Sequence, residues 1–207
     1  MQLLMGLTKE SGDRSRGGAS RLFAPSEAGL LRRVAVGDRE AFVALYENYH
    51  PRLFRYFIKM LRNEGRAEEL AQEVLWEVWK GAKGFQGRSS PSTWIFGIAH
   101  HKGVNELRRK KEEVVEPDAL LHVADPHRGP AEAVEASDLA RLMKEALAKL
   151  SDEHREVLEL TYYQGLSIRE IAEILDCPVN TVKTRMFYAR QKLKAVLLAM
   201  GVTGGSS

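Results

Sequence analysis

The chain has 207 residues, of which 44% are hydrophobic, so it can bury one core or two small ones. Its 31 basic and 28 acidic residues leave a net charge of +3, which alone does not indicate nucleic-acid binding. A single cysteine, Cys177, excludes an internal disulfide framework and a zinc site of paired cysteines. No apolar run has the length of a membrane span and no secretory signal is recognisable. We therefore expect a cytoplasmic protein with no membrane insertion and no cofactor.

The N-terminal residues 1–33 are expected to form a disordered extension. They contain several glycines and scattered charge, without sustained apolar periodicity. A short helix is expected only near residues 27–33. The extension carries no recognisable motif.

A strongly helical pattern begins at Asp38. Apolar and aromatic residues then recur every three or four positions: Phe42, Leu45, Tyr46, Tyr49, Leu53, Phe57 and Leu61. This spacing places them on one face, so we interpret them as core. Pro51 lies inside the run and is predicted to kink or split the helix near His50, because proline lacks a backbone N–H and clashes with the preceding turn.

The next predicted helix covers residues 67–80. Its inward face carries the small and branched apolar residues Ala67, Leu70, Ala71, Val74 and Val78. The opposite face is acidic and polar except for Trp76. A tryptophan ringed by charge is typical of a protein-binding hot spot, and the alternative is that Trp76 covers a neighbouring helix.

A glycine-rich loop, KGAKGFQGRSSPS, covers residues 80–92 and contains Phe85 and Arg88. Ser92 is predicted to cap the helix that follows, with Pro91 forcing an extended lead-in. One flank of that helix combines aromatic, polar and basic side chains: Trp94, His101, Asn105 and Arg108. The helix then ends in four consecutive cations, residues 108–111. Aromatic rings stack on bases and cations neutralise phosphates, so the pattern suits single-stranded DNA. A basic helix C-terminus is equally favoured by the helix dipole, and the residues alone leave both interpretations open.

Residues 114–138 are predicted to be an acidic linker. Within residues 117–140, five acids face the single cation Arg128; these acids are Asp118, Asp125, Glu132, Glu135 and Asp138. The segments on either side carry the basic clusters. An acidic middle between two basic halves indicates two binding modules and a connector.

The C-terminal part contains a helix-turn-helix pattern. An amphipathic helix covers residues 139–150, Ser151 caps a second helix and Gly165 ends it. Ser167 and Glu170 then form a capping box, which satisfies the first free N–H groups of a short third helix. A turn at Asp176 leads to the last helix, which begins at Pro178. This layout is typical of a domain that enters the DNA major groove.

The last helix has one apolar stripe and one cationic face. The stripe that we expect to be buried comprises Val179, Val182, Met186, Ala189, Leu193 and Val196. No acidic residue occurs over residues 179–200, which carry the cations Lys183, Arg185, Arg190, Lys192 and Lys194. Phe187 lies on the polar face, where it can contact a thymine methyl group. The alternatives are that Phe187 packs under the chain terminus and that the cations form a solvated surface.

Three stretches together resemble an extracytoplasmic-function (ECF, group 4) sigma factor of bacterial RNA polymerase. AEELAQEVLWEVWK resembles the polymerase-binding helix of the family, and STWIFGIAHHKGVNELRRKK resembles its promoter −10 helix. LSIREIAEILDCPVNTVKTRMFYARQKL resembles its −35-reading motif. The resemblance implies an all-α fold with a region 2 bundle over residues 34–113 and a region 4 helix-turn-helix domain over residues 139–200. A flexible linker joins them, and residues 201–207 form a flexible tail.

The resemblance also implies residue roles. Contacts to the clamp helices of the largest polymerase subunit are implied for Glu69, Leu70, Gln72, Glu73 and Trp76. Contacts to the melted −10 strand are implied for Phe85, Arg88, Ser89, Trp94, His101, Asn105, Arg108 and Arg109. Contacts to the −35 duplex are implied for Asn180, Thr181, Lys183, Thr184, Arg185, Phe187, Tyr188 and Arg190. The implied partners are core RNA polymerase (clamp helices and flap), promoter DNA and an anti-sigma factor, and no catalytic residue is expected.

Two other functions compete with this hypothesis. A stand-alone helix-turn-helix regulator that acts as a dimer explains the C-terminal pattern but not the stripe around Trp76. A metal-dependent enzyme would use His100, His101, His122 or His127. Adjacent histidines on a helix point in different directions and do not converge on one metal, unlike a pair four residues apart.

Overall fold

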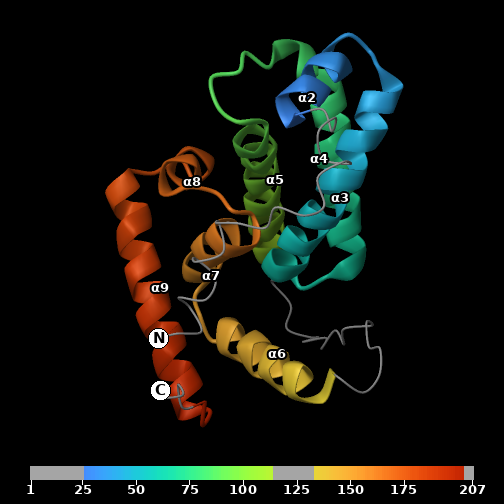
Figure 1. Ribbon diagram of the computed structural model, residues 1–207. Helices are drawn as coiled ribbons and strands as arrows, with labels where there is room; N and C mark the ends of the chain where they lie inside the picture. Colours follow the sequence, from blue (N-terminus) through green and yellow to red (C-terminus); the bar gives the residue numbers. More distant parts are fainter. Residues whose placement is uncertain (1–25, 114–132, 203–207) are drawn as a thin grey trace, which may run out of the picture.

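The computed structural model describes residues 26–113 and 133–202, and all the regular elements in these ranges are helices, with no strand among them (Figure 1). The predicted all-α fold is therefore confirmed for the described residues. The elements are α2 (Glu27–Ala35), α3 (Arg39–Leu61), α4 (Glu64–Gly81), the 3₁₀ segment η1 (Ala82–Gly84), α5 (Pro91–Glu113), α6 (Ala133–Ala148), α7 (Asp152–Leu158), the π-helical segment η2 (Glu159–Tyr163), α8 (Ile168–Ile174) and α9 (Val179–Ala199).

Helices α2 to α5 form an N-terminal module around one apolar core. The largest side chains in this core include Leu31, Leu45, Tyr49, Phe57 and Phe96, none of them more than 1% exposed. α3 lies at its centre and packs against α2, α4 and α5. The prediction that the periodic apolar residues of 42–61 pack in the core is therefore confirmed.

Helix α2 confirms the short helix expected near residues 27–33, but it belongs to the N-terminal module, which the predicted boundary at residue 33 excluded. The helix runs from Glu27 to Ala35, and Leu30, Leu31 and Val34 are buried in the core of the N-terminal module. Ser26 caps it by accepting a hydrogen bond from the Gly29 N–H at 3.1 Å. Residues 1–25 of the predicted extension lie outside the described residues. The module begins earlier because the apolar face of α2 packs against α3 and η1.

Pro51 does not split α3, as the sequence suggested it could. The helix is assigned as one element from Arg39 to Leu61 with Pro51 inside it. Tyr49 and Leu53, one on each side of the proline, are completely buried. Their packing in the core stabilises the helix on both sides of the missing N–H.

Ser90, not Ser92, caps α5. The Ser90 hydroxyl accepts a hydrogen bond from the Thr93 N–H at 3.1 Å, and the Ser90 carbonyl accepts one from the Trp94 N–H at 3.0 Å. Pro91 then occupies the first helical position, where its missing N–H costs nothing and its fixed φ is suitable. The prediction that Pro91 precedes the helix and Ser92 caps it is therefore wrong, because the helix begins at Pro91.

Helices α6 to α9 form the C-terminal module and contain the predicted helix-turn-helix. The capping box of Ser167 and Glu170 is present at the start of α8, and Asp176 adopts the predicted left-handed conformation with φ 45°. Gly165, with φ +70°, ends the preceding segment as predicted. α6 starts at Ala133, inside the range predicted to be linker. The remaining linker residues, 114–132, and the tail from 203 lie outside the described residues.

The two glycines of α5 differ in the space around them, which gives a stability prediction. A Cβ at Gly103 would overlap the Met60 sulfur and lie 3.4 Å from the Phe57 ring, whereas a Cβ at Gly97 would meet nothing. We expect Gly97→Ala to raise the free energy of unfolding by about 0.5–1 kcal/mol. The free energy of unfolding of Gly103→Ala should be about 1–3 kcal/mol lower than that of Gly97→Ala, since Met60 must move. Urea denaturation followed by circular dichroism measures both, and equal stabilisation would contradict the packing described.

The two modules pack directly on each other. In Figure 1, α7 and α8 lie beside α5, while α9 lies on the side away from α4. None of the described helices is both long and apolar enough to cross a membrane.

Candidate nucleic-acid and polymerase surfaces

Helix α9 buries one face and exposes the other. Val182, Met186, Ala189 and Leu193 of the predicted stripe are at most 5% exposed and Val196 is partly buried. The prediction that Val179 is buried is wrong, because this residue is 36% exposed at the first position of the helix. The opposite face exposes six of the residues predicted to meet the −35 element: Asn180, Lys183, Thr184, Phe187, Tyr188 and Arg190. Thr181 and Arg185 are partly buried. The structure therefore brings the predicted −35 residues together on one accessible surface.

The exposed face of α9 carries two aromatic rings. Phe187 is 56% exposed and Tyr188 is 54% exposed, and their rings pack edge to face with centroids 5.4 Å apart. The two rings therefore form one joined aromatic patch on the exposed face of α9. A solvated helix gains nothing from two exposed rings, whereas a groove offers sugars and thymine methyl groups to them.

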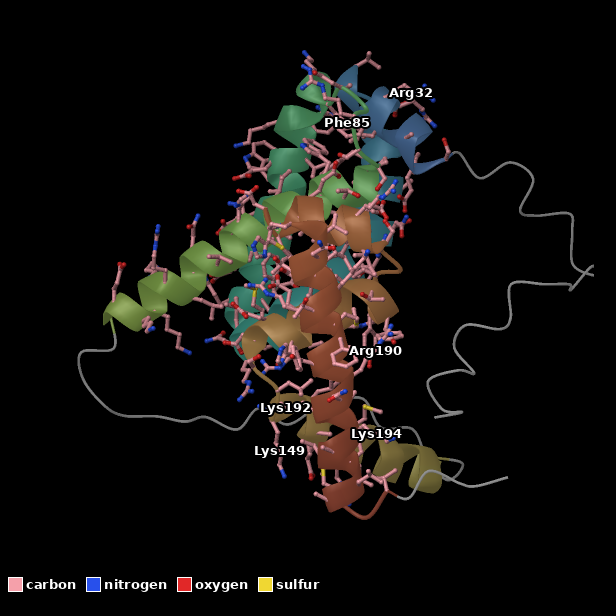
Figure 2. The ribbon with its side chains drawn as sticks, turned by 90° about the vertical axis from the view of Figure 1, so that its left-hand side faces the viewer. Arg32, Phe85, Lys149, Arg190, Lys192 and Lys194 are labelled. Carbon is pink, nitrogen blue, oxygen red and sulfur yellow. The ribbon has the colours of Figure 1, made fainter. Side chains whose placement is uncertain are left out.

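The arginines of α9 are held by the rest of the module. The Arg185 guanidinium lies 3.0 Å from a Glu153 carboxylate oxygen, and the Arg190 guanidinium lies 5.6 Å from the centre of the Tyr162 ring. Figure 2 shows Arg190 and Lys194 on one side of α9 and Lys192 on the other. Arg190 and Lys194, one helical turn apart, can contact a phosphate backbone together.

The predicted −10 surface begins at the loop before α5. The rings of Phe85 and Trp94 lie 5.1 Å apart, and Trp94 also packs against Gly81. Phe85, Ser89 and Trp94 are all partly buried. The loop is thus anchored by an aromatic pair, and the exposed Arg88 lies between the two rings in sequence.

Further along α5, His101, Asn105 and Arg108 are exposed, as expected for a strand-binding flank. Arg108 donates to the Asn105 side-chain oxygen at 3.5 Å. Arg109 is also exposed, but its guanidinium forms an ion pair with a Glu106 carboxylate oxygen at 2.7 Å. This hydrogen bond lowers the pKa of Glu106, and Arg66 lowers it further.

The predicted polymerase-binding face of α4 centres on Trp76. This side chain is 57% exposed, with the Lys80 ammonium 5.5 Å from its ring centre. Glu69 and Gln72 are exposed beside it and Glu73 is half-buried. Leu70 is 2% exposed and belongs to the core. The prediction that the Leu70 side chain meets the polymerase is therefore wrong, because the stripe that buries Ala67 and Val74 also buries Leu70.

Ion pairs fix the acidic side of α4. Arg66 bridges Glu69 at 2.7 Å and Glu106 of α5 at 3.0 Å. Lys102 of α5 bridges Glu73 at 3.0 Å and Glu77 at 2.9 Å. Burial lowers the pKa of Lys102, but the two carboxylates outweigh it and raise the pKa overall. The acids that surround Trp76 are therefore positioned by α5.

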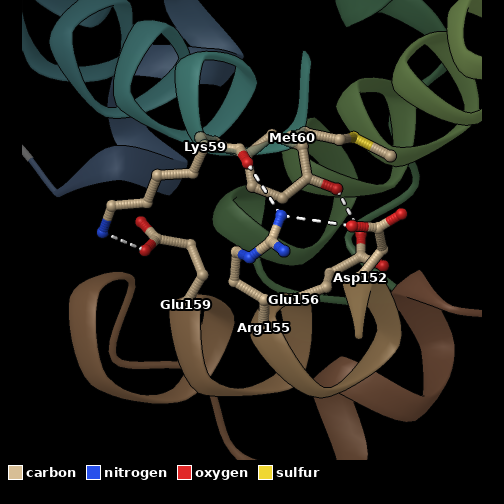
Figure 3. Close-up of a pocket in the computed structure, with 7 residues that line it drawn as sticks. Lys59, Met60, Asp152, Arg155, Glu156 and Glu159 are labelled. Carbon is tan, nitrogen blue, oxygen red and sulfur yellow. Dashed lines mark hydrogen bonds and ion pairs between the residues drawn. The ribbon is translucent and has the colours of Figure 1, made fainter. Parts of the chain in front are cut away.

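A polar interface that the sequence did not predict joins the two modules. Lys59 of α3 forms an ion pair with Glu159 of η2, whose side chain is 4% exposed (Figure 3). Glu156 of α7 accepts hydrogen bonds from the Tyr56 hydroxyl at 2.5 Å and pairs with the His100 ring at 2.7 Å. Burial raises the pKa of Tyr56 and lowers that of Lys59.

The same interface reaches the start of α5. The hydroxyls of Ser90 and Thr93 both donate to one oxygen of Glu170, at 2.8 and 3.0 Å. Burial acts to raise the pKa of Glu170, but hydrogen bonds from Ser167, Ser90 and Thr93 outweigh it and lower the pKa. The one signal in the sequence is Glu159 itself, a carboxylate placed between the inward-facing Leu158 and Leu160.

The protein is a pair of helical modules: one has an exposed, acid-free cationic helix, and the other an exposed tryptophan among acidic side chains. Within the described residues, no group of three or more His, Cys, Asp or Glu side chains could hold a metal, and His122 and His127 lie outside them. The Sigma-70 region 2 family matches residues 45–113 and the Sigma-70 region 4 family matches residues 140–193. These matches coincide with the two modules.

Relatives over most of the chain identify the family more closely. The ECF RNA polymerase sigma factor SigK of Mycolicibacterium vanbaalenii is 31% identical over 84% of this chain and 88% of the relative. The ECF RNA polymerase sigma factor SigW of Bacillus subtilis is 32% identical over 81% of this chain and 94% of the relative. The chain belongs to the ECF RNA polymerase sigma factors, as its sequence motifs predicted.

Solved structures show the same fold. CnrH, in complex with the cytosolic domain of CnrY, matches with a TM-score of 0.60 and 25% identity, over 84% of this chain and 97% of CnrH. The sigma factor RpoE from Bartonella quintana, in complex with the anti-sigma factor NepR, matches with a TM-score of 0.59 and 24% identity, over 76% of this chain and 97% of RpoE.

Proposed function

We propose that this sigma factor binds core RNA polymerase through the Trp76 face of α4, melted −10 DNA through α5 and its preceding loop, and −35 duplex through α9. The observation that carries the proposal is the separation of chemistry between modules. An exposed tryptophan among fixed acids lies on one module, and an acid-free cationic helix with two exposed rings lies on the other. A tryptophan hot spot would bind a protein and a cationic helix would bind a DNA groove, and a sigma factor needs both contacts.

Division of labour follows from the contacts that each surface can make. Lysines and arginines of α9 would supply phosphate contacts, which give affinity without sequence information, while Asn180 and Phe187 would read base edges. Phe85 and Trp94 would stack on unpaired bases, which offsets the few kcal/mol that unstacking a base requires. Neither surface alone would bind promoter DNA tightly. Polymerase would fix their separation, so that the second contact becomes intramolecular.

A partner that controls the protein fits the same surfaces. CnrH is in complex with a second protein, the cytosolic domain of CnrY. We propose that an anti-sigma factor binds this chain likewise and masks the Trp76 face. The protein would then act in the cytoplasm as an initiation factor without enzymatic activity of its own.

Binding to core polymerase distinguishes this function from that of a stand-alone helix-turn-helix regulator. Purified full-length protein mixed with core polymerase should elute with it in size-exclusion chromatography. A stand-alone regulator would elute separately, as a dimer. Separate elution would overturn the proposal.

Lys183 should contribute a phosphate contact. Lys183→Ala is expected to weaken binding to duplex DNA and to reduce the slope of log K against log salt concentration by about 0.9, since one fewer counterion is released. A duplex of arbitrary sequence suffices, because a phosphate contact is independent of sequence. Lys144→Ala, an exposed lysine of α6, is the control and should leave the slope unchanged. Equal slopes for both variants would remove Lys183 from the proposed surface.

A further inference from the structure

One carboxylate ties helix α2 to the first turn of α5. Glu27, the first residue of α2, accepts hydrogen bonds from the Tyr49 hydroxyl at 2.6 Å and from the Ser92 hydroxyl at 3.1 Å. The Tyr49 and Ser92 hydroxyl oxygens lie 2.8 Å apart, so the three groups are in mutual contact. The Tyr49 side chain is completely buried, and the Arg52 guanidinium lies 3.6 Å from the other Glu27 oxygen. The start of α2 therefore has a fixed position relative to the start of α5.

Helix α2 also packs against the segment that precedes the loop. This segment, η1, ends at Gly84, directly before Phe85. The helix thus contacts both ends of the loop over residues 85–90, through η1 on one side and through Ser92 on the other. Figure 1 shows α2 at the loop end of α5, away from the basic C-terminus of α5. The proposed −10 surface therefore has α2 beyond its loop.

The outer face of α2 carries an arginine that no described side chain binds. Arg32 and Arg33 are both exposed, but Arg33 donates to an Asp38 carboxylate oxygen at 2.8 Å. Within residues 26–113 and 133–202, no ion pair or hydrogen bond engages the Arg32 guanidinium. Figure 2 shows Arg32 at the same end of the N-terminal module as Phe85. Its charge is therefore available to a ligand at the loop.

The loop and the elements beside it lack acidic residues. Residues 78–105 contain no Asp or Glu, and two exposed cations, Lys83 of η1 and Arg88 of the loop, lie within them. The nearest carboxylate of α2 is Glu27, which is engaged by hydroxyl groups. With Arg32, three exposed cations occur on the elements that hold the Phe85 ring. Rings that stack on bases, with cations beside them, are what single-stranded nucleic acid requires.

We propose that α2 forms the far side of the −10 site, where Arg32 binds a phosphate of the displaced strand. This contact would lie on the side of Phe85 opposite to the α5 residues His101 and Arg108. The proposal rests on the proposed function, because it takes α5 and its loop as the strand-binding surface. Phosphates held on both sides of a stacked base would fix the backbone around that base, so the base would be held out of the duplex.

Four variants of the full chain test the proposal. Arg32→Gln removes the phosphate contact, and Arg32→Lys retains its charge. Arg33→Gln is the matched control, because it removes the same charge from the adjacent position, where the side chain binds Asp38. Arg108→Gln removes the same charge from the α5 surface of the proposed function. All three positions are exposed, so circular dichroism melting should show that each variant folds as the wild type does.

The first readout is binding to a fluorescent 12-nucleotide single-stranded DNA of mixed sequence, followed by anisotropy over a range of salt concentrations. Arg32→Gln should reduce the slope of log K against log salt concentration by about 0.7, since one fewer counterion is released from a single strand. This change corresponds to about fivefold weaker binding at 0.1 M salt. Arg33→Gln and Arg32→Lys should match the wild type. A wild-type slope for Arg32→Gln, or an equal reduction for Arg33→Gln, overturns the proposal.

The second readout is binding to a duplex of arbitrary sequence. Arg32→Gln should leave duplex affinity unchanged, because the proposed duplex-binding helix is α9. An equal loss on duplex and single strand would show that Arg32 acts only through the net charge of the protein, and this also overturns the proposal.

Arg108→Gln separates the two levels of the argument. If it lowers the single-strand slope and Arg32→Gln does not, the inference about α2 is wrong and the proposed −10 surface on α5 stands. If neither variant changes the slope, the proposed −10 surface is itself wrong.

Discussion

Replacing Trp76 with alanine should lower the affinity for core RNA polymerase by about 30-fold or more, which corresponds to about 2 kcal/mol or more for a hot-spot aromatic residue. Trp76 is 57% exposed, so its removal should leave the free energy of unfolding nearly unchanged. Duplex DNA binding by α9 should also be unchanged, because α9 belongs to the other module. Titration of labelled protein with core polymerase measures the loss.

Trp79 provides the matched control on the same helix. It is half-buried, and its ring packs edge to face on Phe42 with centroids 5.0 Å apart. Trp79→Ala should therefore destabilise the N-terminal module by about 3 kcal/mol. Molecules of this variant that remain folded should bind polymerase as the wild type does. If Trp76→Ala lowered stability and DNA binding as much as polymerase binding, the division between the two modules would be wrong.

Replacing Phe187 with alanine should weaken binding of the −35 duplex by about 10- to 100-fold, the effect of losing about 1–3 kcal/mol of base-specific contact. Phe187 is 56% exposed and packs only edge to face on Tyr188, so the fold does not depend on it. The loss should be smaller on duplexes without the −35 element, because phosphate contacts are retained there. Fluorescence anisotropy with both kinds of duplex measures the difference.

Leu198 is the matched control for Phe187. It lies on the same helix and is 52% exposed, but it is outside the proposed DNA-reading set. Leu198→Ala should leave duplex affinity unchanged. An equal loss in both variants would show that exposed apolar area on α9, rather than a specific contact, drives binding.

Local features of the fold were predictable from the sequence. The capping box at Ser167, the left-handed turn at Asp176 and the buried stripe of α9 depend on residues within a few positions of each other. Such features are set by backbone geometry and helical periodicity, which a sequence displays directly. The surfaces proposed for polymerase on α4 and for −35 DNA on α9 were recognisable for the same reason, since each is one face of one helix.

Features that depend on distant residues were not predictable in this way. The start of the N-terminal module was misplaced because α2 becomes a helix by burying Leu31 against α3. The π-helical segment η2 places Glu159 towards Lys59, which lies 100 residues earlier in the chain. Glu170 reads as a helix cap in the sequence, and its contact with Ser90 and Thr93 appears only when the modules pack. Periodicity contains no information about which faces of two modules meet.

Run-off transcription shows whether the protein lets core polymerase start RNA synthesis at a promoter. The purified protein would be combined with core polymerase from the same organism and a library of promoter fragments. We expect discrete transcripts from fragments that share a −35 and a −10 sequence, and none from core polymerase alone. Absence of transcripts from every template, with an active core enzyme confirmed by another sigma factor, would contradict it.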